Sequence, residues 1–167
     1  MFRKMRRFRQ ALPEAAVRDI LLARTNGVLA LSGDDGYPYA VPVSYVYDPD
    51  ENCIFFHGAK EGHKIDAIRR NEKVSFCVVD KDEIVPKEFT SYFRSVIVFG
   101  KIRIVKDEEE KRRSIDKLAR KYSPDETDAS RGAEIEKEWR SLCMLRLDIE
   151  NMTGKEAIEL TGQRQEN

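Results

Sequence analysis

Compact turn signals separate three apolar runs in the first third of the chain, and this spacing most constrains the fold. The runs are residues 28–32, 37–47 and 53–57, and the turns between them are residues 33–36 and 48–52. Connections this short join antiparallel strands, because a parallel pair needs a crossover of roughly a dozen residues or more. Pro38 and Pro42 cannot donate to a ladder, which places the second strand at an edge or a bulge. The sequence therefore predicts an antiparallel meander.

The rest of the chain alternates between helical and strand-like periodicity. Helical spacing predicts helices over residues 14–24, 62–71 and 107–122, with a shorter one carrying Ile135 and Trp139. Apolar or alternating runs predict strands at 74–79, 91–105 and 142–149, joined in part by a charged connection at 80–87. Gly100 is expected at a bulge or a close backbone approach. Together these elements indicate an α+β domain built on an antiparallel barrel or sheet.

Length and charge exclude several classes of protein. The 167 residues contain no repeat or linker, so we expect a single domain over residues 1–167. Thirty basic and thirty acidic residues cancel, which removes the field that would hold nucleic acid or an anionic membrane. No uncharged stretch approaches the ~20 residues of a membrane span, and no apolar signal-peptide core follows the basic start. We expect a cytoplasmic protein whose residues 1–10 and 155–167 are a mobile basic arm and a mobile polar tail.

Three familiar kinds of site find little support. No Gly-x-Gly-x-x-Gly follows a strand, as a Rossmann nicotinamide site requires, and residues 58–64 depart from the phosphate loop of nucleotide triphosphatases. Cys53 and His57 share a strand face, but the close ligand pairs of zinc sites are absent, so we predict no metal. The cysteines are odd in number and widely spaced, which argues against disulfides.

The most informative segment is residues 55–64. A strand ends at His57, a loop containing Gly58 follows, and a helix opens near Gly62. The free N–H groups of a helix N-terminus, with Lys64 and His63 as cationic donors, suit a dianionic phosphate monoester. The two glycines let the backbone approach such a ligand closely. A surface turn with a solvated lysine is the other interpretation, and the pattern alone leaves both open.

Three segments of the chain resemble the FMN-binding split-barrel proteins. They are Val41-Pro-Val-Ser-Tyr-Val-Tyr-Asp48, Phe55-Phe-His-Gly-Ala-x-Glu-Gly-His-Lys64-Ile-Asp and Asn71-Glu-Lys-Val-Ser-Phe. Within this pyridoxamine 5′-phosphate oxidase-like superfamily the chain is similar to the nitroimidazole-resistance branch, including its basic start and its Asn151-Met-Thr-Gly-Lys-Glu156 ending. The resemblance implies a six-stranded antiparallel split β-barrel with flanking helices, which forms a homodimer with FMN in two clefts at the subunit interface.

The same segments supply candidate cofactor-binding positions. These are Val41, Val43, Ser44, His57, Gly58, Ala59, Gly62, His63, Lys64 and Ser95. The resemblance implies that the strand around Val41 lines the flavin through backbone groups, that His63 and Lys64 hold the phosphate, and that Ser95 reaches the flavin from the other subunit. The oxidases themselves carry arginine and glutamine where this chain has His63 and Ser95, and their Arg-Leu-x-Pro ending is missing, so we do not expect their substrate.

His57 is the candidate catalytic residue, because the resemblance implies that it lies beside the flavin. Histidine titrates near neutral pH, which suits proton delivery to a substrate that receives electrons. Packing against the flavin is an equally open interpretation of the same residue.

The expected activity is that of an FMN-dependent reductase, which passes electrons from a nicotinamide donor to a small oxidant such as a nitroaromatic compound. In such enzymes the flavin performs the difficult chemistry. No acid–base dyad stands out in the sequence. A non-enzymatic protein that binds or senses flavin is therefore an alternative, and so is the same fold holding haem or a deazaflavin.

Overall fold

Antiparallel strands close into a barrel in the order β1-β2-β3-β6-β5-β4 in the computed structural model, which describes residues 1–163. The strands are β1 (Asn26–Ser32), β2 (Pro38–Asp48), β3 (Cys53–Ala59), β4 (Lys73–Val85), β5 (Thr90–Ile104) and β6 (Leu142–Glu156). Short turns join the first three strands, as the spacing of the turn signals predicted. The antiparallel meander and the α+β split barrel are confirmed.

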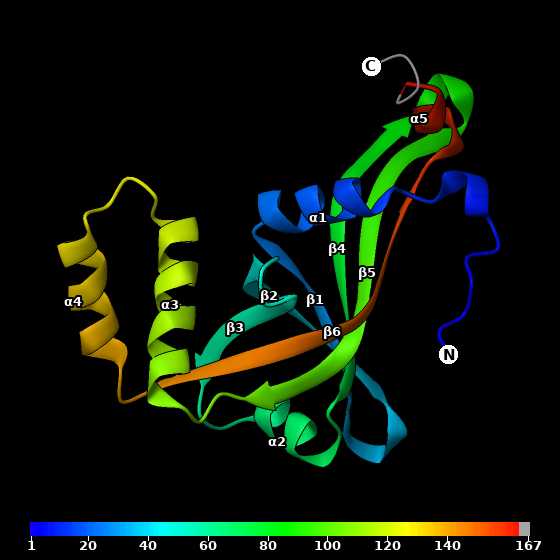
Figure 1. Cartoon of the computed structure of the whole chain (residues 1–167). Coiled ribbons are helices and arrows are strands. Elements are labelled where there is room, and N and C mark those ends of the chain that lie inside the picture. Colours follow the sequence, from blue (N-terminus) through cyan, green and yellow to red (C-terminus); the bar gives the residue numbers. More distant parts are fainter. Residues whose placement is uncertain (164–167) are drawn as a thin grey trace.

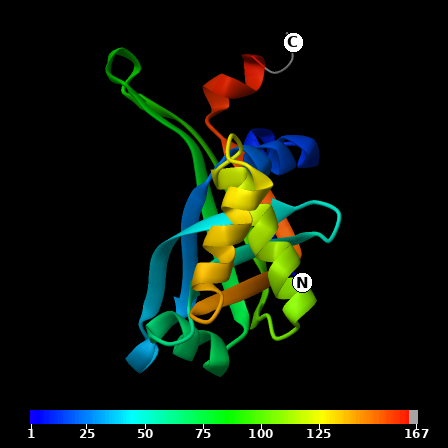
Figure 2. The same cartoon turned by 90° about the vertical axis from the view of Figure 1, so that its left-hand side faces the viewer.

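Helices lie around this barrel (Figure 1). They are α1 (Glu14–Ala23), α2 (His63–Arg70), α3 (Glu108–Tyr122), α4 (Asp128–Glu138) and α5 (Ile158–Gln163). Figures 1 and 2 show α1 and α2 at opposite ends of the barrel, while α3 and α4 stand together beside it. The side chain of Asp107 caps α3 by accepting a hydrogen bond from the Glu110 N–H at 2.7 Å. No helix in the described part of the chain is long and apolar enough to cross a membrane.

The first four residues of β3 are buried, so this part of the strand is covered on both faces. Phe56 points into the barrel, where it meets the ring of Phe76 edge-on at 5.1 Å. Phe55 points the other way and belongs to a second apolar cluster, which Ile115 of α3 and Ile135 of α4 cover. A strand covered on both sides needs a continuous apolar run, and residues 53–56 supply one. The α3–α4 pair is thereby fixed beside the end of β3.

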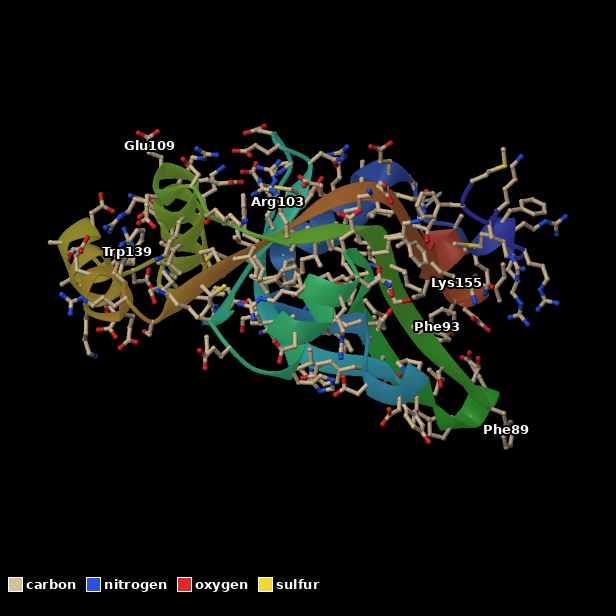
Figure 3. All side chains as sticks on the ribbon, turned by 90° about the horizontal axis from the view of Figure 1, so that it is seen from below. Phe89, Phe93, Arg103, Glu109, Trp139 and Lys155 are labelled. Carbon is tan, nitrogen blue, oxygen red and sulfur yellow. The ribbon has the colours of Figure 1, made fainter. Side chains whose placement is uncertain are left out.

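The charged segment 80–87 is not a simple connection, and that prediction is wrong. Strand β4 continues through Val85 after an irregularity between Val79 and Lys81, and it pairs with β5 as far as Thr90. The two strands form an arm that projects from the barrel, with Phe89 at its tip (Figures 2 and 3). A two-stranded ribbon in water has no face to bury, so its sequence lacks the alternation that identifies a strand.

The predicted polar tail is also wrong in its first part. Lys155 and Glu156 end β6 opposite Ser95 and Arg94, and α5 follows them. Glu156 is fully buried and accepts a hydrogen bond from Arg94 Nε at 3.2 Å. Its partner lies 62 positions away in the sequence, so local pattern gave no sign of burial. Residues 164–167 lie outside the described residues, and the mobility of residues 1–10 stays a prediction.

Stability should fall steeply above pH 9, in part because of Cys53. Burial raises the pKa of this thiol to about 12, from 9.0 in an unfolded chain. Between these values the folded state keeps a proton that the unfolded state has lost, so this contribution is complete below pH 9 and disappears as the pH rises through 12. Each pH unit costs about 1.4 kcal/mol.

Denaturant unfolding at pH 8, 9, 10 and 11 measures this slope for the wild-type protein and for Cys53→Ala. The variant should lose stability less steeply with rising pH, whatever its stability at pH 8. Parallel curves for the two proteins would show that the Cys53 thiol does not contribute to the alkaline loss.

Candidate functional site

Strands β2 and β3 separate halfway along their length, and the candidate site lies there. They pair only where Tyr45–Asp48 faces Cys53–Phe56. The first half of β2, residues 38–44, pairs with β1 alone, and the last residues of β3, 57–59, pair with β6 alone. Each strand therefore has an unpaired edge beyond the point of separation. These two edges and the start of α2 are called the candidate site below.

The two prolines of β2 belong to its unpaired edge. The Gly33 N–H donates to the Tyr37 carbonyl at 2.9 Å, which fixes the direction of alternate residues along the strand. The backbone polar groups of residues 39, 41 and 43 consequently face β1. Those of Pro38, Ala40, Pro42 and Ser44 face the free edge. The prediction that these prolines lie on an edge is confirmed.

The three predicted flavin contacts on β2 differ in the direction of their backbone polar groups. The backbone groups of Val41 and Val43 are turned toward β1, and their partly buried side chains pack against the barrel core. The free edge of β2 therefore presents no backbone hydrogen-bonding group of Val41 or Val43, and their contact with a flavin stays a prediction. Ser44 is half-buried, and its backbone faces the unpaired edge.

Lys64, in the first turn of α2, reaches back over Gly58. A Cβ atom built on Gly58 would lie 3.1 Å from the Lys64 Nζ, so a larger residue would crowd the ammonium group. Burial lowers the pKa of Lys64, and partial burial together with the charge of Lys64 lowers the pKa of His57. In the described part of the chain no carboxylate lies within ion-pairing distance of Lys64. A half-buried cation without a counter-ion favours the binding of an anion.

The start of α2 adds backbone donors to this cation. Gly62 precedes the helix with a φ of 117°, a conformation that favours glycine, and no side chain within residues 1–163 caps the helix. The first intrahelical bond runs from the Asp66 N–H to the Gly62 carbonyl, so the N–H groups before Asp66 have no helical partner. Gly58 and Ala59 form the end of β3 that leads into this loop. The sequence prediction of a helix start beside Lys64 is confirmed.

His63 holds α2 to β2 and to the turn between β1 and β2. Its ring stacks on Tyr39 with centroids 4.0 Å apart, and its Nε2 lies 3.4 Å from Asp34 Oδ2. Asp34 also pairs with Arg70 of α2 at 2.6 Å. His63 thus already has two partners, and its binding of a phosphate together with Lys64 stays a prediction.

Ser95 lies far from His57 and the end of β3 within one chain. On β6, Met144 is opposite His57, whereas Lys155 is opposite Ser95. The strand between these two positions is roughly 35 Å long at ~3.3 Å per residue. Within one chain Ser95 therefore does not reach His57, and a contact with a ligand bound there would need the Ser95 of a second copy.

A cavity of about 390 Å³ opens beside His57, between the α3–α4 pair and the barrel. Ile115, Ile135 and Leu142 form apolar parts of its wall, and Glu134 is among its polar residues. The sequence analysis missed this cavity, although glutamates spaced one helical turn apart on residues 128–138 were a usable signal. Within residues 1–163 no three His, Cys, Asp or Glu side chains come together as metal ligands do.

The closed antiparallel barrel and the position of the site define a split-barrel protein. The sequence profile of the pyridoxamine 5′-phosphate oxidase family matches residues 13–156. The chain belongs to this family. Comparison with curated proteins gave no match.

Solved structures agree with this assignment. The chain is similar to a "putative 5-nitroimidazole antibiotic resistance protein" from Bacteroides thetaiotaomicron, with 25% identity, a TM-score of 0.71, and coverage of 87% of this chain and 85% of that one. A conserved hypothetical protein from Mycobacterium tuberculosis has 21% identity and a TM-score of 0.77, over 92% and 90% of the two chains. An FAD and heme binding protein from Mycobacterium smegmatis has 21% identity and a TM-score of 0.71, over 89% and 73%. The last two similarities show the fold alone.

Proposed function

We propose that the protein is an FMN-dependent oxidoreductase that acts as a homodimer and reduces small oxidants such as nitroaromatic compounds. The observation that carries this proposal is Lys64, a half-buried cation without a carboxylate partner at the uncapped start of α2. The similarity to the "putative 5-nitroimidazole antibiotic resistance protein" supports the choice of oxidant.

The residues at the start of α2 fit the phosphate of FMN. Lys64 would supply a charge-assisted hydrogen bond, and the open N–H groups of the first helical turn would supply neutral ones. Gly58 has no side chain that would hinder Lys64 from moving toward the ligand. A Cβ atom built at this position would lie only 3.1 Å from the ammonium nitrogen of Lys64.

An apolar outer face of the sheet supports the homodimer. Val28 of β1, Val79 of β4, and Ile97 and Phe99 of β5 are 39%, 59%, 40% and 38% exposed. Val28 is opposite Cys77, and Cys77 is opposite Ile97, so these side chains form a continuous row across three strands. Exposed apolar patches of this kind mark interaction sites. A second copy that covered this face would also supply the distant Ser95.

His57 would serve as the proton donor. A bound flavin carries electrons from a nicotinamide donor to the oxidant, and reduction of a nitro group consumes protons as well. His57 is the first residue of β3 beyond its pairing with β2, and it lines the cavity next to α3 and α4. A proton on its imidazole ring would therefore pass to a substrate held in that cavity, and solvent would replace it.

Lys64→Ala should weaken FMN binding by about 1.5–3 kcal/mol, or roughly 10- to 100-fold, because it removes a charge-assisted bond to the phosphate. Quenching of flavin fluorescence measures the dissociation constant. Riboflavin, which lacks the phosphate, should bind the variant and the wild type equally.

Lys60→Ala is the matched control for this test, because Lys60 lies exposed in the same loop. We expect it to change FMN binding by less than about threefold. A wild-type protein that does not quench FMN fluorescence would refute the proposed cofactor. An equal loss of FMN affinity in the two variants would show that the phosphate is attracted by the overall positive charge of the loop rather than by a specific bond to Lys64.

The absorbance of the purified protein distinguishes FMN from haem or a deazaflavin. Anaerobic addition of NADH or NADPH then distinguishes an enzyme from a protein that only binds flavin. Rapid bleaching of the flavin, followed by recovery on addition of a nitroaromatic compound, supports the reductase. A flavin that neither donor bleaches would contradict it.

A further inference from the structure

The cavity beside His57 has the size and the lining of a small-molecule site. Its volume of about 390 Å³ lies within the range of roughly 300–1,000 Å³ that is usual for such sites. Ile115 of α3, Ile135 of α4 and Leu142 at the start of β6 are each less than 9% exposed and give it apolar walls. A ligand between these side chains would lie next to His57.

Carboxylates dominate the charged groups that line the cavity. They belong to Glu126, Glu134 and Glu138. Glu134 pairs with Lys137 at 3.1 Å, but both side chains are 67% exposed, and an exposed pair of this kind cancels little charge in water. Glu138 accepts a neutral hydrogen bond from the Ser141 hydroxyl at 3.2 Å, which leaves its charge intact.

The cation among the lining residues, Arg131, is engaged in part. Its guanidinium donates to the Asp128 carboxylate at 2.5 Å and to the Ser123 carbonyl at 2.9 Å. These bonds hold the connection between α3 and α4, but Asp128 also pairs with Arg120 at 2.9 Å, and Arg131 Nε is buried without a hydrogen-bond partner among the described residues. Three carboxylates against one guanidinium nevertheless give the lining of the cavity a net negative charge.

We propose that this cavity binds the oxidant and that it selects cationic or uncharged aromatic compounds over anionic ones, an inference that rests on the proposed flavin function. The apolar walls accept an aromatic ring. Glu134 and Glu138 lie one helical turn apart on α4, so both attract a cationic substituent on that ring. The same charge repels phosphate, so the phosphates of a nicotinamide donor do not settle here and the cavity is left to the oxidant.

Three ligands that share a nitrobenzene ring test this selectivity. At pH 7, 4-nitrobenzylamine is cationic, 4-nitrobenzyl alcohol is uncharged and 4-nitrobenzoate is anionic. Calorimetric titration of each into the purified full-length protein, with its flavin content measured by absorbance, gives three dissociation constants. We expect the amine to bind roughly 5- to 10-fold more tightly than the alcohol, and the benzoate most weakly. Raising the ionic strength should shrink these ratios.

Glu134→Gln and Glu138→Gln should each lower the amine-to-alcohol preference by roughly threefold. Glu136→Gln is the matched control: Glu136 lies on the same helix but pairs with Arg112 of α3 rather than lining the cavity. The preference should survive in this variant.

The inference is overturned if benzoate binds as tightly as the amine, if Glu136→Gln lowers the preference as much as the other two variants, or if none of the three ligands binds. Flavin content separates these failures from those of the proposed function. Protein that takes up no flavin but keeps the amine preference would reject the flavin proposal and support the selectivity of the cavity. Protein with full flavin content and no preference would reject the selectivity alone.

Discussion

Replacing His57 with glutamine should slow the reoxidation of the flavin protein by a nitroaromatic compound by roughly 10²–10⁴-fold, with unchanged flavin content. Glutamine keeps a hydrogen-bonding side chain of similar reach, but it cannot deliver a proton near neutral pH. Anaerobic reduction followed by stopped-flow mixing with the oxidant gives the rate, normalised to bound flavin by absorbance. Reoxidation of the variant at the wild-type rate would show that His57 is only a packing neighbour of the flavin.

The pH dependence of the same rate provides a further check on His57. Partial burial and the charge of Lys64 lower its pKa below the ordinary 6.5. The protonated form accumulates only on acidification, so the rate should rise as the pH falls below 6.5. Lys64→Met, measured at saturating flavin, raises the pKa of His57 and shifts the profile to higher pH. His63→Gln keeps the charge of Lys64 and should leave the profile in place.

Gly100→Ala is expected to lower the free energy of unfolding by about 3 kcal/mol or more, because the new methyl group has no room. A Cβ atom at this position would lie 2.1 Å from the backbone oxygen of Asp148 on β6. Gly100 also marks the register shift between β5 and β6, as its place in the sequence predicted. The two strands would have to separate locally to accept the substitution.

Chemical denaturation measures this loss, and Gly132→Ala is the control. Gly132 lies within α4, and a Cβ atom there meets nothing within 4 Å. Alanine should stabilise that helix by roughly 0.5–1 kcal/mol. A Gly100→Ala protein as stable as the wild type would show that β5 and β6 are farther apart at this point than the structure places them.

Local sequence patterns predicted the strands and helices whose burial and turns are encoded within the same segment of chain. Residues 28–57 alternate strands with compact turns, and β1 to β3 follow that pattern closely. The extension of β4 through Val85 was missed because both of its faces meet water, and the burial of Glu156 was missed because its partner Arg94 is distant in sequence. In both cases the missing information is tertiary.

In the candidate site, too, the features within one segment were predictable from the sequence, and those that depend on tertiary contacts were not. His57, Gly58 and Lys64 lie within eight residues, so their proximity follows from a single strand–loop–helix segment. His63 belongs to that segment too, yet its orientation depends on Asp34 and Tyr39 of the preceding hairpin. The acidic cavity depends on how α3 and α4 pack beside β3, which no short stretch of sequence encodes.

The free edge of β2 has a consequence for the protein before it acquires any cofactor. An exposed strand edge is a template on which further chains can add, and this is a common route to aggregation. Pro38 and Pro42 remove two of the N–H donors that residues 38, 40, 42 and 44 would otherwise present, so a second strand cannot complete a ladder there. In the newly made chain this edge is thus open to a ligand, but it does not pair with the edge strands of other copies.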